Sequence, residues 1–73
     1  MERYEIEKIN TMPDMYIVSD KQTETYCLFE KGKFNETQEF RNYTRGKYNA
    51  QELATICREI GDWLRINHYD KIF

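Results

Sequence analysis

The first thirty residues alternate between short hydrophobic runs and polar turns. Tyr4-Glu5-Ile6-Glu7 alternates apolar and polar side chains, which predicts a half-buried strand over residues 3–9. Pro13-Asp14 indicates a turn, because proline presets φ and the aspartate side chain can bond the backbone ahead of it. Apolar runs predict two more strands at 15–18 and 24–29, with a polar hairpin loop at 19–23 between them.

The last third of the chain has the periodicity of one amphipathic helix, over about residues 50–66. Asn49 is a favourable N-cap, and Glu52 follows three residues later as its reciprocal partner in a capping box. Tyr48 is expected to pack on Leu53 as a hydrophobic staple. Hydrophobic side chains recur at steps of three and four, at Leu53, Ile56, Cys57, Ile60, Trp63 and Leu64.

The polar side of this helix predicts a weak exposed ion pair between Arg58 and Asp62, four residues apart. Gly61 lies inside the helix at the edge of the apolar stripe, where glycine costs about 1 kcal/mol relative to alanine. We expect a close approach of the helix to the sheet to explain it.

Residues 34–48 are less regular. Lys31-Gly32 predicts a tight turn, after which Lys33-Phe34 begins either a fourth strand or a loop. Asn35 followed by Gln38 fits the cap of a short helix, whereas alternate residues from Phe34 to Phe40 fit one face of a strand. We expect an irregular segment with one turn of helix, ending at Gly46.

Together these elements predict one small α+β domain over residues 1–73. Three or four antiparallel strands would form a sheet, and one C-terminal amphipathic helix would pack on one of its faces, in the order β-β-β-(β)-α. A core of this size rarely supplies more than about 3–5 kcal/mol of net stability, so we expect a second subunit to add to it.

The two central strands are apolar on both faces, and one helix covers only one. We expect the helix to pack on Ile17, Cys27 and Phe29, because tyrosine tolerates water better than aliphatic residues. The opposite face would then expose an aromatic-aliphatic patch of the kind that marks an interface. Its members would be Tyr16, Val18, Tyr26, Leu28 and Tyr4. Three alternatives remain open: residues 34–48 and the tail 69–73 cover this face, a homodimer forms through it, or another protein binds it.

Composition limits the class of protein. Hydrophobic residues make up 40% of the chain and charged residues 33%, with a net charge of −2. That charge argues against both a strongly basic nucleic-acid binder and an acidic DNA mimic. No apolar run approaches the ~20 residues that span a bilayer, and the N-terminus has no signal-peptide pattern, so we expect a cytoplasmic protein with no membrane association. Abundant Ile, Lys, Asn and Tyr suggest an AT-rich genome, such as that of a low-GC bacterium or its phage.

Candidate catalytic and metal-binding residues are sparse. Cys27 and Cys57 lie in apolar runs, where cysteine acts as a small hydrophobe. His68 and Asp70 have no CxxC or HxxxH pattern beside them that would support a metal site. Pairs of glutamates, Glu5 with Glu7 and Glu36 with Glu39, are more typical of a solvated surface than of acid-base catalysis. No glycine-rich nucleotide motif occurs. We therefore expect no cofactor, no metal and no enzyme activity.

The middle of the chain is its only basic stretch, because residues 31–48 carry a net charge of +3. Arg41, Tyr43, Arg45 and Lys47 interleave cations with an aromatic ring, as in sites that hold single-stranded nucleic acid, and Lys33 could extend the patch.

The sequence therefore predicts a small non-catalytic module that binds a larger protein through the aromatic-aliphatic patch. By analogy, such a protein would be an accessory protein or inhibitor encoded by a phage or mobile element, and it could also form a homodimer. The alternative is a single-stranded nucleic-acid-binding protein that uses residues 41–48.

Overall fold

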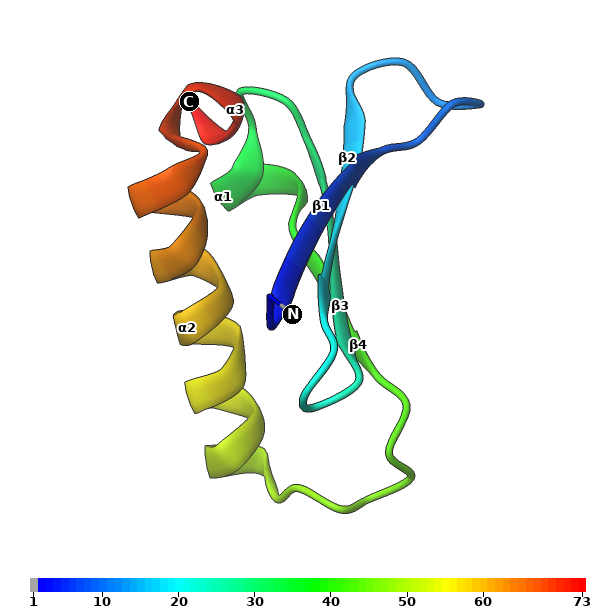
Figure 1. Ribbon diagram of the computed structural model, residues 1–73, viewed down its shortest axis with the longest axis vertical. Helices are drawn as coiled ribbons and strands as arrows, with labels where there is room; N and C mark the ends of the chain where they lie inside the picture. The colour runs from blue at the N-terminus through cyan, green and yellow to red at the C-terminus, as the bar shows by residue number, and fades with distance from the viewer. Residues whose placement is uncertain (1) are drawn as a thin grey trace.

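A computed structural model describes residues 2–73 (Figure 1). A four-stranded antiparallel sheet in the order β1-β2-β3-β4 is followed by a long C-terminal helix, as the sequence predicted. In chain order the elements are β1 (Tyr4–Lys8), β2 (Met15–Asp20), β3 (Thr25–Glu30), α1 (Phe34–Thr37), β4 (Glu39–Asn42), α2 (Ala50–Asn67) and α3 (Tyr69–Ile72).

The long helix begins where its capping signal lies. The Asn49 side chain accepts a hydrogen bond from the backbone N–H of Glu52, at 2.8 Å, and the Glu52 carboxylate accepts one from the backbone N–H of Asn49, at 3.0 Å. This capping box satisfies two amides that the first turn of a helix otherwise leaves unpaired. Tyr48 and Leu53, the predicted staple pair, each pack against the core.

The helices α1, α2 and α3 lie on one side of the sheet, and we call this side the inner face (Figure 1). Among residues 2–73, the core between the helices and the sheet contains eight buried hydrophobic side chains: Val18, Cys27, Phe29, Phe34, Ile56, Ile60, Leu64 and Ile72. Burial of a hydrophobic side chain of this kind contributes roughly 1.5–3 kcal/mol. The helix α2 therefore owes its stability mainly to this apolar stripe.

The strand register corrects the predicted faces of the sheet. Val18 pairs directly with Cys27, and Tyr16 pairs directly with Phe29. Directly opposed residues point to the same face, so Tyr16 and Val18 lie on the inner face with the helix. Val18 is fully buried, and the ring of Tyr16 stacks on that of Phe29 at 5.8 Å. Tyr4 also lies on the inner face, since it is level with Asp20 and packs against the core.

The opposite, outer face contains a different set from the predicted patch. Ile17 pairs with Leu28, and Ser19 pairs with Tyr26. Tyr26 and Leu28 are therefore on the uncovered face as predicted, but Ile17 is there too, where the prediction had placed it under the helix. The error arose because both parities of β2 are apolar, so hydrophobicity alone could not choose between them.

The segment 34–48 contains both of the elements that its pattern allowed. Residues Phe34–Thr37 form one helical turn, and Glu39–Asn42 form the fourth strand, which begins later than the predicted Lys33 or Phe34. The predicted Asn35 cap is wrong, because Lys33 is the N-cap and no side chain caps this short helix. Phe34 and Ile72 are both buried in the inner core, so α1 and α3 close the helix side and leave the outer face uncovered.

Two expectations about the surface of α2 are also wrong. Asp62 bonds Arg65, at 3.2 Å, and not Arg58. A Cβ atom at Gly61 would meet the guanidinium of Arg65 at 3.1 Å, and the sheet is not among its nearest neighbours. The side chain of Arg65, and not the sheet, therefore occupies the space beside this glycine.

Candidate functional site

The outer face carries an apolar centre that the described helices leave uncovered (Figure 1). Ile17, Leu28 and Tyr26 are half-buried there on the two central strands. Tyr43, just beyond β4, sets its ring edge-on to that of Tyr26, with 5.4 Å between the centroids. These four residues and Arg41 line a depression of about 410 Å³. A pocket of this size with an apolar floor fits one bulky side chain of a partner.

Ion pairs surround this centre. Arg41 bonds Glu39 on β4 at 2.5 Å, and Lys21 bonds Glu5 at 2.5 Å. Glu7 neighbours Glu5 on the same face of β1, and within residues 2–73 it forms no ion pair. A hydrogen bond and the charge of Glu5 raise the pKa of Glu7, whereas the bond from Lys21 is the main cause that lowers the pKa of Glu5. The outer face therefore has an excess of negative charge along β1.

The predicted protein-binding patch is only partly assembled by the fold. The structure brings Tyr26 and Leu28 together on the outer face, and it places Tyr16, Val18 and Tyr4 in or against the core on the opposite side. Sequence reasoning missed Ile17 and did not assign Tyr43 to this surface. The matching parity of Ile17 and Leu28 could have been found only with the register of the β2–β3 hairpin.

The cations of the basic segment do not form one continuous patch on the surface. Arg41 is already bonded to Glu39 on the outer face, and Lys47 lies 5.5 Å above the ring of Tyr48. Arg45 lies in the loop before α2 with a φ of 57°, followed by Gly46 with a φ of 89°. The loop and α1, which follows Lys33, lie at opposite ends of the sheet (Figure 1), and Lys33 pairs with Glu30, so Lys33 does not extend the patch.

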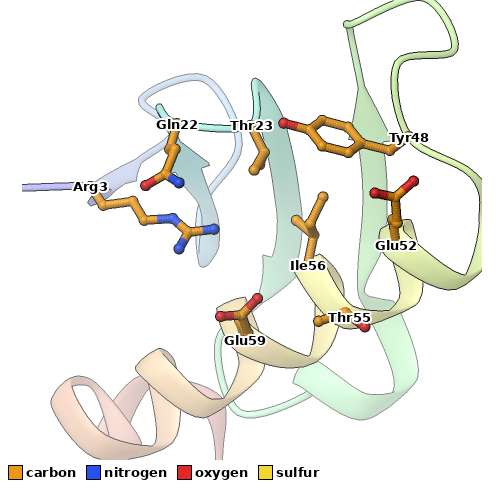
Figure 2. Close-up of a pocket in the computed structure, with 8 residues that line it drawn as sticks. All are labelled: Arg3, Gln22, Thr23, Tyr48, Glu52, Thr55, Ile56 and Glu59. Atoms are coloured by element: carbon orange, nitrogen blue, oxygen red, sulfur yellow. The ribbon is translucent and has the colours of Figure 1, made fainter.

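A second, polar cleft lies between α2 and the start of the sheet (Figure 2). It has a volume of about 340 Å³, and Ile56 is the buried apolar residue at its wall. Its remaining lining residues are Arg3, Gln22, Thr23, Tyr48, Glu52, Thr55 and Glu59. The Arg3 guanidinium and the Glu59 carboxylate point into it from opposite sides, and the Tyr48 hydroxyl points across it toward Thr23 (Figure 2).

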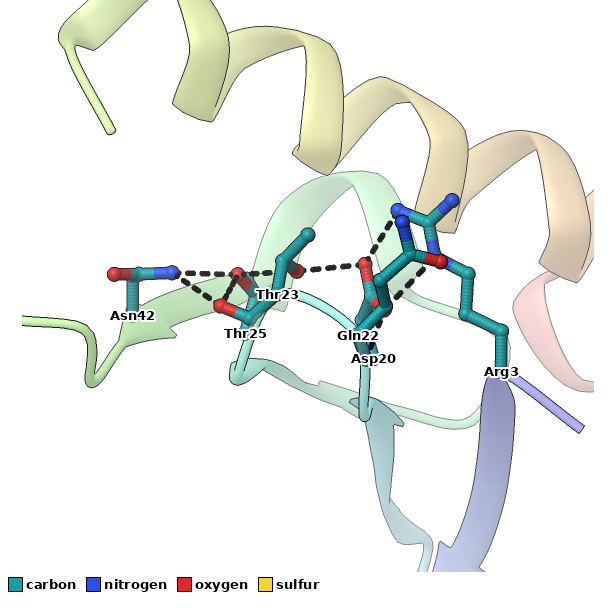
Figure 3. A network of polar contacts seen from close by, with 6 residues as sticks. All are labelled: Arg3, Asp20, Gln22, Thr23, Thr25 and Asn42. Atoms are coloured by element: carbon teal, nitrogen blue, oxygen red, sulfur yellow. Dashed lines mark hydrogen bonds and ion pairs between the residues drawn. The ribbon is translucent and has the colours of Figure 1, made fainter. Parts of the chain in front are cut away.

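A buried carboxylate holds the sheet side of this cleft in place (Figure 3). Asp20 is fully buried and accepts hydrogen bonds from Arg3 Nε and Nη2, each at 2.9 Å. The Thr23 hydroxyl donates to the same carboxylate at 2.7 Å, and the backbone N–H of Gln22 donates at 3.1 Å. Burial raises the pKa of Asp20, but the bonds from Arg3 and Thr23 outweigh it, and the net pKa is lowered. Asp20 is therefore an ionised group that supports the fold, although the sequence predicted a polar hairpin loop over residues 19–23.

The network continues across the sheet to its opposite edge (Figure 3). Thr23 and Thr25 hydroxyls lie 3.0 Å apart, and Asn42 Nδ2 donates to the Thr25 hydroxyl at 2.8 Å and to the Thr23 carbonyl at 2.9 Å. Asn42 Oδ1 in turn accepts from the backbone N–H of Thr44 at 3.0 Å. These bonds tie the segment before β1 to the β2–β3 loop and to the end of β4.

The polar groups of the cleft are largely engaged in maintaining the fold. Arg3 and Thr23 bond Asp20, the Glu52 carboxylate completes the helix cap, and the Thr55 hydroxyl donates to the Gln51 carbonyl at 3.2 Å. A site for small-molecule chemistry needs polar groups that remain free for the ligand. The outer face is therefore the stronger candidate for a binding site.

The two cysteines are free thiols. Burial raises the pKa of the Cys27 thiol to about 12 and also raises the pKa of Cys57. The thiolate is the nucleophile, so neither environment activates the sulfur. His68 caps the end of α2, with its ring 4.9 Å from that of Trp63, and Asp70 lies 3.7 Å from Lys71. These contacts account for His68 and Asp70 without a catalytic arrangement.

Another exposed apolar cluster lies at the end of the helical layer. Ile66 is 81% exposed, Tyr69 61% and Phe73 59%, and the last two rings lie 4.9 Å apart. None of these three residues lines either pocket described above. Because it is apolar and distant in sequence from the strands, this cluster is a useful comparison surface for the outer face.

Comparisons with protein-family models, with curated proteins and with solved structures gave no match. Among residues 2–73, no helix has the length and apolar character needed to cross a membrane.

Proposed function

We propose that this chain is a small non-catalytic module that binds a larger protein through the outer face of its sheet. The observation that carries the proposal is the apolar centre at Ile17, Tyr26 and Leu28, which no described helix covers. Tyrosine and aliphatic side chains in a shallow depression, with polar groups around them, are typical of protein interfaces.

The other features of the chain are consistent with this role. The inner face is closed by three helices and tied at one end by the Asp20 network, so it forms a firm support. Interfaces on such rigid supports lose little conformational entropy on binding. An accessory or inhibitory role, in which the module occupies a surface of its target, would follow from this kind of binding.

Site-specific photo-crosslinking tests the proposal. A photoreactive phenylalanine analogue at position 26 should crosslink one protein from the native host in stoichiometric yield, and Leu28→Ser should abolish this product. The analogue at position 66 provides the control, because Ile66 is a more exposed apolar position on another surface. Equal yields at the two positions, or a product that survives Leu28→Ser in a folded variant, would contradict the proposal.

A further inference from the structure

The charges around the outer face indicate which kind of partner this face would bind. In one row across the sheet, Glu7, Ile17, Leu28 and Glu39 lie side by side, from β1 to β4. Neighbouring strands are about 4.8 Å apart, so a carboxylate stands at each end of an apolar pair. A glutamate side chain therefore flanks the apolar centre on each side, Glu7 on β1 and Glu39 on β4.

The two carboxylates are not equally satisfied. Glu39 Oε1 accepts both bonds from Arg41. Glu7 forms no ion pair with residues 2–73, and it shares its face of β1 with Glu5, whose own partner is Lys21. Lys21 and Arg41 are each already bonded to a glutamate. A cation from outside the chain would therefore find its most favourable position beside Glu7.

A second copy of the chain packed with aligned strands does not supply that cation. Such copies can pack outer face to outer face about a two-fold axis that lies either along the strands or across them. An axis along the strands, between β2 and β3, exchanges β1 with β4, so Glu7 would face Glu39 of the second copy. Glu5 would face Arg41, but that arginine is already bonded to Glu39.

An axis across the strands is no better. It lays β1 over β1, so the carboxylates of Glu5 and Glu7 face the same pair in the second copy. Like charges directly opposed across an interface are destabilising. The first arrangement places Glu7 opposite a carboxylate that Arg41 already neutralises, and the second places the acids of β1 opposite one another, so neither supplies a cation for Glu7.

We infer that the outer face binds a basic, amphipathic segment of a different protein, an inference that rests on the proposed function. One bulky apolar side chain enters the depression between Leu28, Tyr26 and Tyr43, and a lysine or arginine pairs with Glu7. Glu7 is two strands from Leu28, which places the two contacts about 10 Å apart. Positions i and i+7 of a helix, separated by about 10.5 Å, match this spacing.

Selection from a random peptide library displayed on phage, against the immobilised full chain, tests this inference. The expected binders carry a basic residue about two helical turns from a leucine or aromatic residue. Peptides without a basic residue, or with an acidic one at that spacing, would overturn the inference.

Affinities of a selected peptide for three variants then separate this inference from the proposed function. Glu7→Lys should weaken binding by about three- to tenfold, as reversal of one rim charge does. Glu36→Lys, an exposed acid on α1, makes the same change of charge away from the outer face and should have no effect. Leu28→Ser should abolish binding. Circular dichroism confirms that each variant is folded.

These results distinguish the inference of a basic partner from the proposed function. Binding that needs Leu28 but is unchanged in Glu7→Lys leaves the proposed function standing and refutes the basic partner. Binding that is unchanged in Leu28→Ser refutes the proposed function itself. In sedimentation equilibrium the free chain should be a monomer at micromolar concentration, and a dimer that Leu28→Ser dissociates would also refute the inference.

Discussion

Replacement of Asp20 by alanine tests the network that supports the sheet. The carboxylate accepts four hydrogen bonds, from Arg3 Nε and Nη2, Thr23 Oγ1 and Gln22 N. Hydrogen bonds to a charged group contribute about 1.5–3 kcal/mol each when nothing replaces them. Full loss of a partner from a buried pair costs about 3–5 kcal/mol.

The geometry reduces that cost to about 3 kcal/mol. The Arg3 side chain is 29% exposed, so its guanidinium regains part of its hydration after the substitution. Thr23 is only 5% exposed, so water does not replace the hydrogen bond that its hydroxyl loses, and this loss accounts for most of the free-energy cost. A domain of this size rarely has more than about 3–5 kcal/mol of net stability, and 1 kcal/mol shifts Tm by about 4–8 °C. We therefore expect Asp20→Ala to lower Tm by roughly 12–24 °C.

Urea and thermal unfolding followed by Trp63 fluorescence measure this change, since the chain has one tryptophan. Asp62→Ala is the matched control, because it removes an exposed aspartate whose pair with Arg65 stabilises the fold by a few tenths of a kcal/mol. If Asp20→Ala lowers Tm no more than Asp62→Ala does, the network does not support the fold and the reasoning fails.

Acid sensitivity gives the same residue a second test. Because the folded-state pKa of Asp20 is lowered, its contribution is fully present above the unfolded-state pKa of about 3.9. It is lost as pH falls from there through the folded-state pKa. The free energy of unfolding of the wild type should therefore fall more steeply below about pH 4 than that of Asp20→Ala, and parallel curves would contradict the assignment.

Three other substitutions or labels give independent expectations. Asn49→Ala should lower the free energy of unfolding in urea by about 1 kcal/mol, because it removes the helix cap. Gly61→Ala should raise it by up to about 1 kcal/mol, since the new methyl meets only the flexible end of Arg65, and a loss of stability would show that this side chain cannot move. A thiol reagent at pH 8 should label Cys57 first and Cys27 only on unfolding, as mass spectrometry of timed samples would show, because Cys27 is fully buried with a pKa of about 12.

Local signals account for the parts of the fold that the sequence predicted well. The capping box at Asn49 and Glu52 and the spacing of the apolar residues after it are both contained within the helix, so α2 could be placed within one residue of its observed ends. The strands were recognisable for the same reason, because alternation and turn residues are local properties.

Register depends on contacts between distant residues, and it was the main source of error. Met15-Tyr16-Ile17-Val18 is apolar at every position, so a shift of one residue exchanges its faces without exposing a polar group. The pairing of Val18 with buried Cys27 places Val18 on the inner face, and Ile17 therefore on the outer face. If one face of this strand were polar, the sequence would have predicted which face packs under the helix. Residues 15–18 are apolar on both faces, so the sequence did not.

Asp20 shows the opposite difficulty, a polar residue that looks solvated but is buried. Its position after an apolar run and before Lys21 is typical of a loop. Its partner Arg3 is 17 residues away, and no spacing rule connects the two. The threonines gave a weak signal, because Thr25 has the same strand parity as Cys27 and Phe29 and is buried with them.

The division of polar groups between the two faces links the fold to the proposed binding. On the inner face, a carboxylate is buried only where Arg3 and Thr23 satisfy it, so that end of the sheet is held by bonds a partner cannot easily replace. On the outer face the charged pairs are exposed, and such pairs contribute little to stability. Binding can therefore rearrange the outer charges at small cost while the inner network keeps the sheet in register. It follows that substitutions at Asp20 should act on stability, and substitutions at Glu7 on affinity alone.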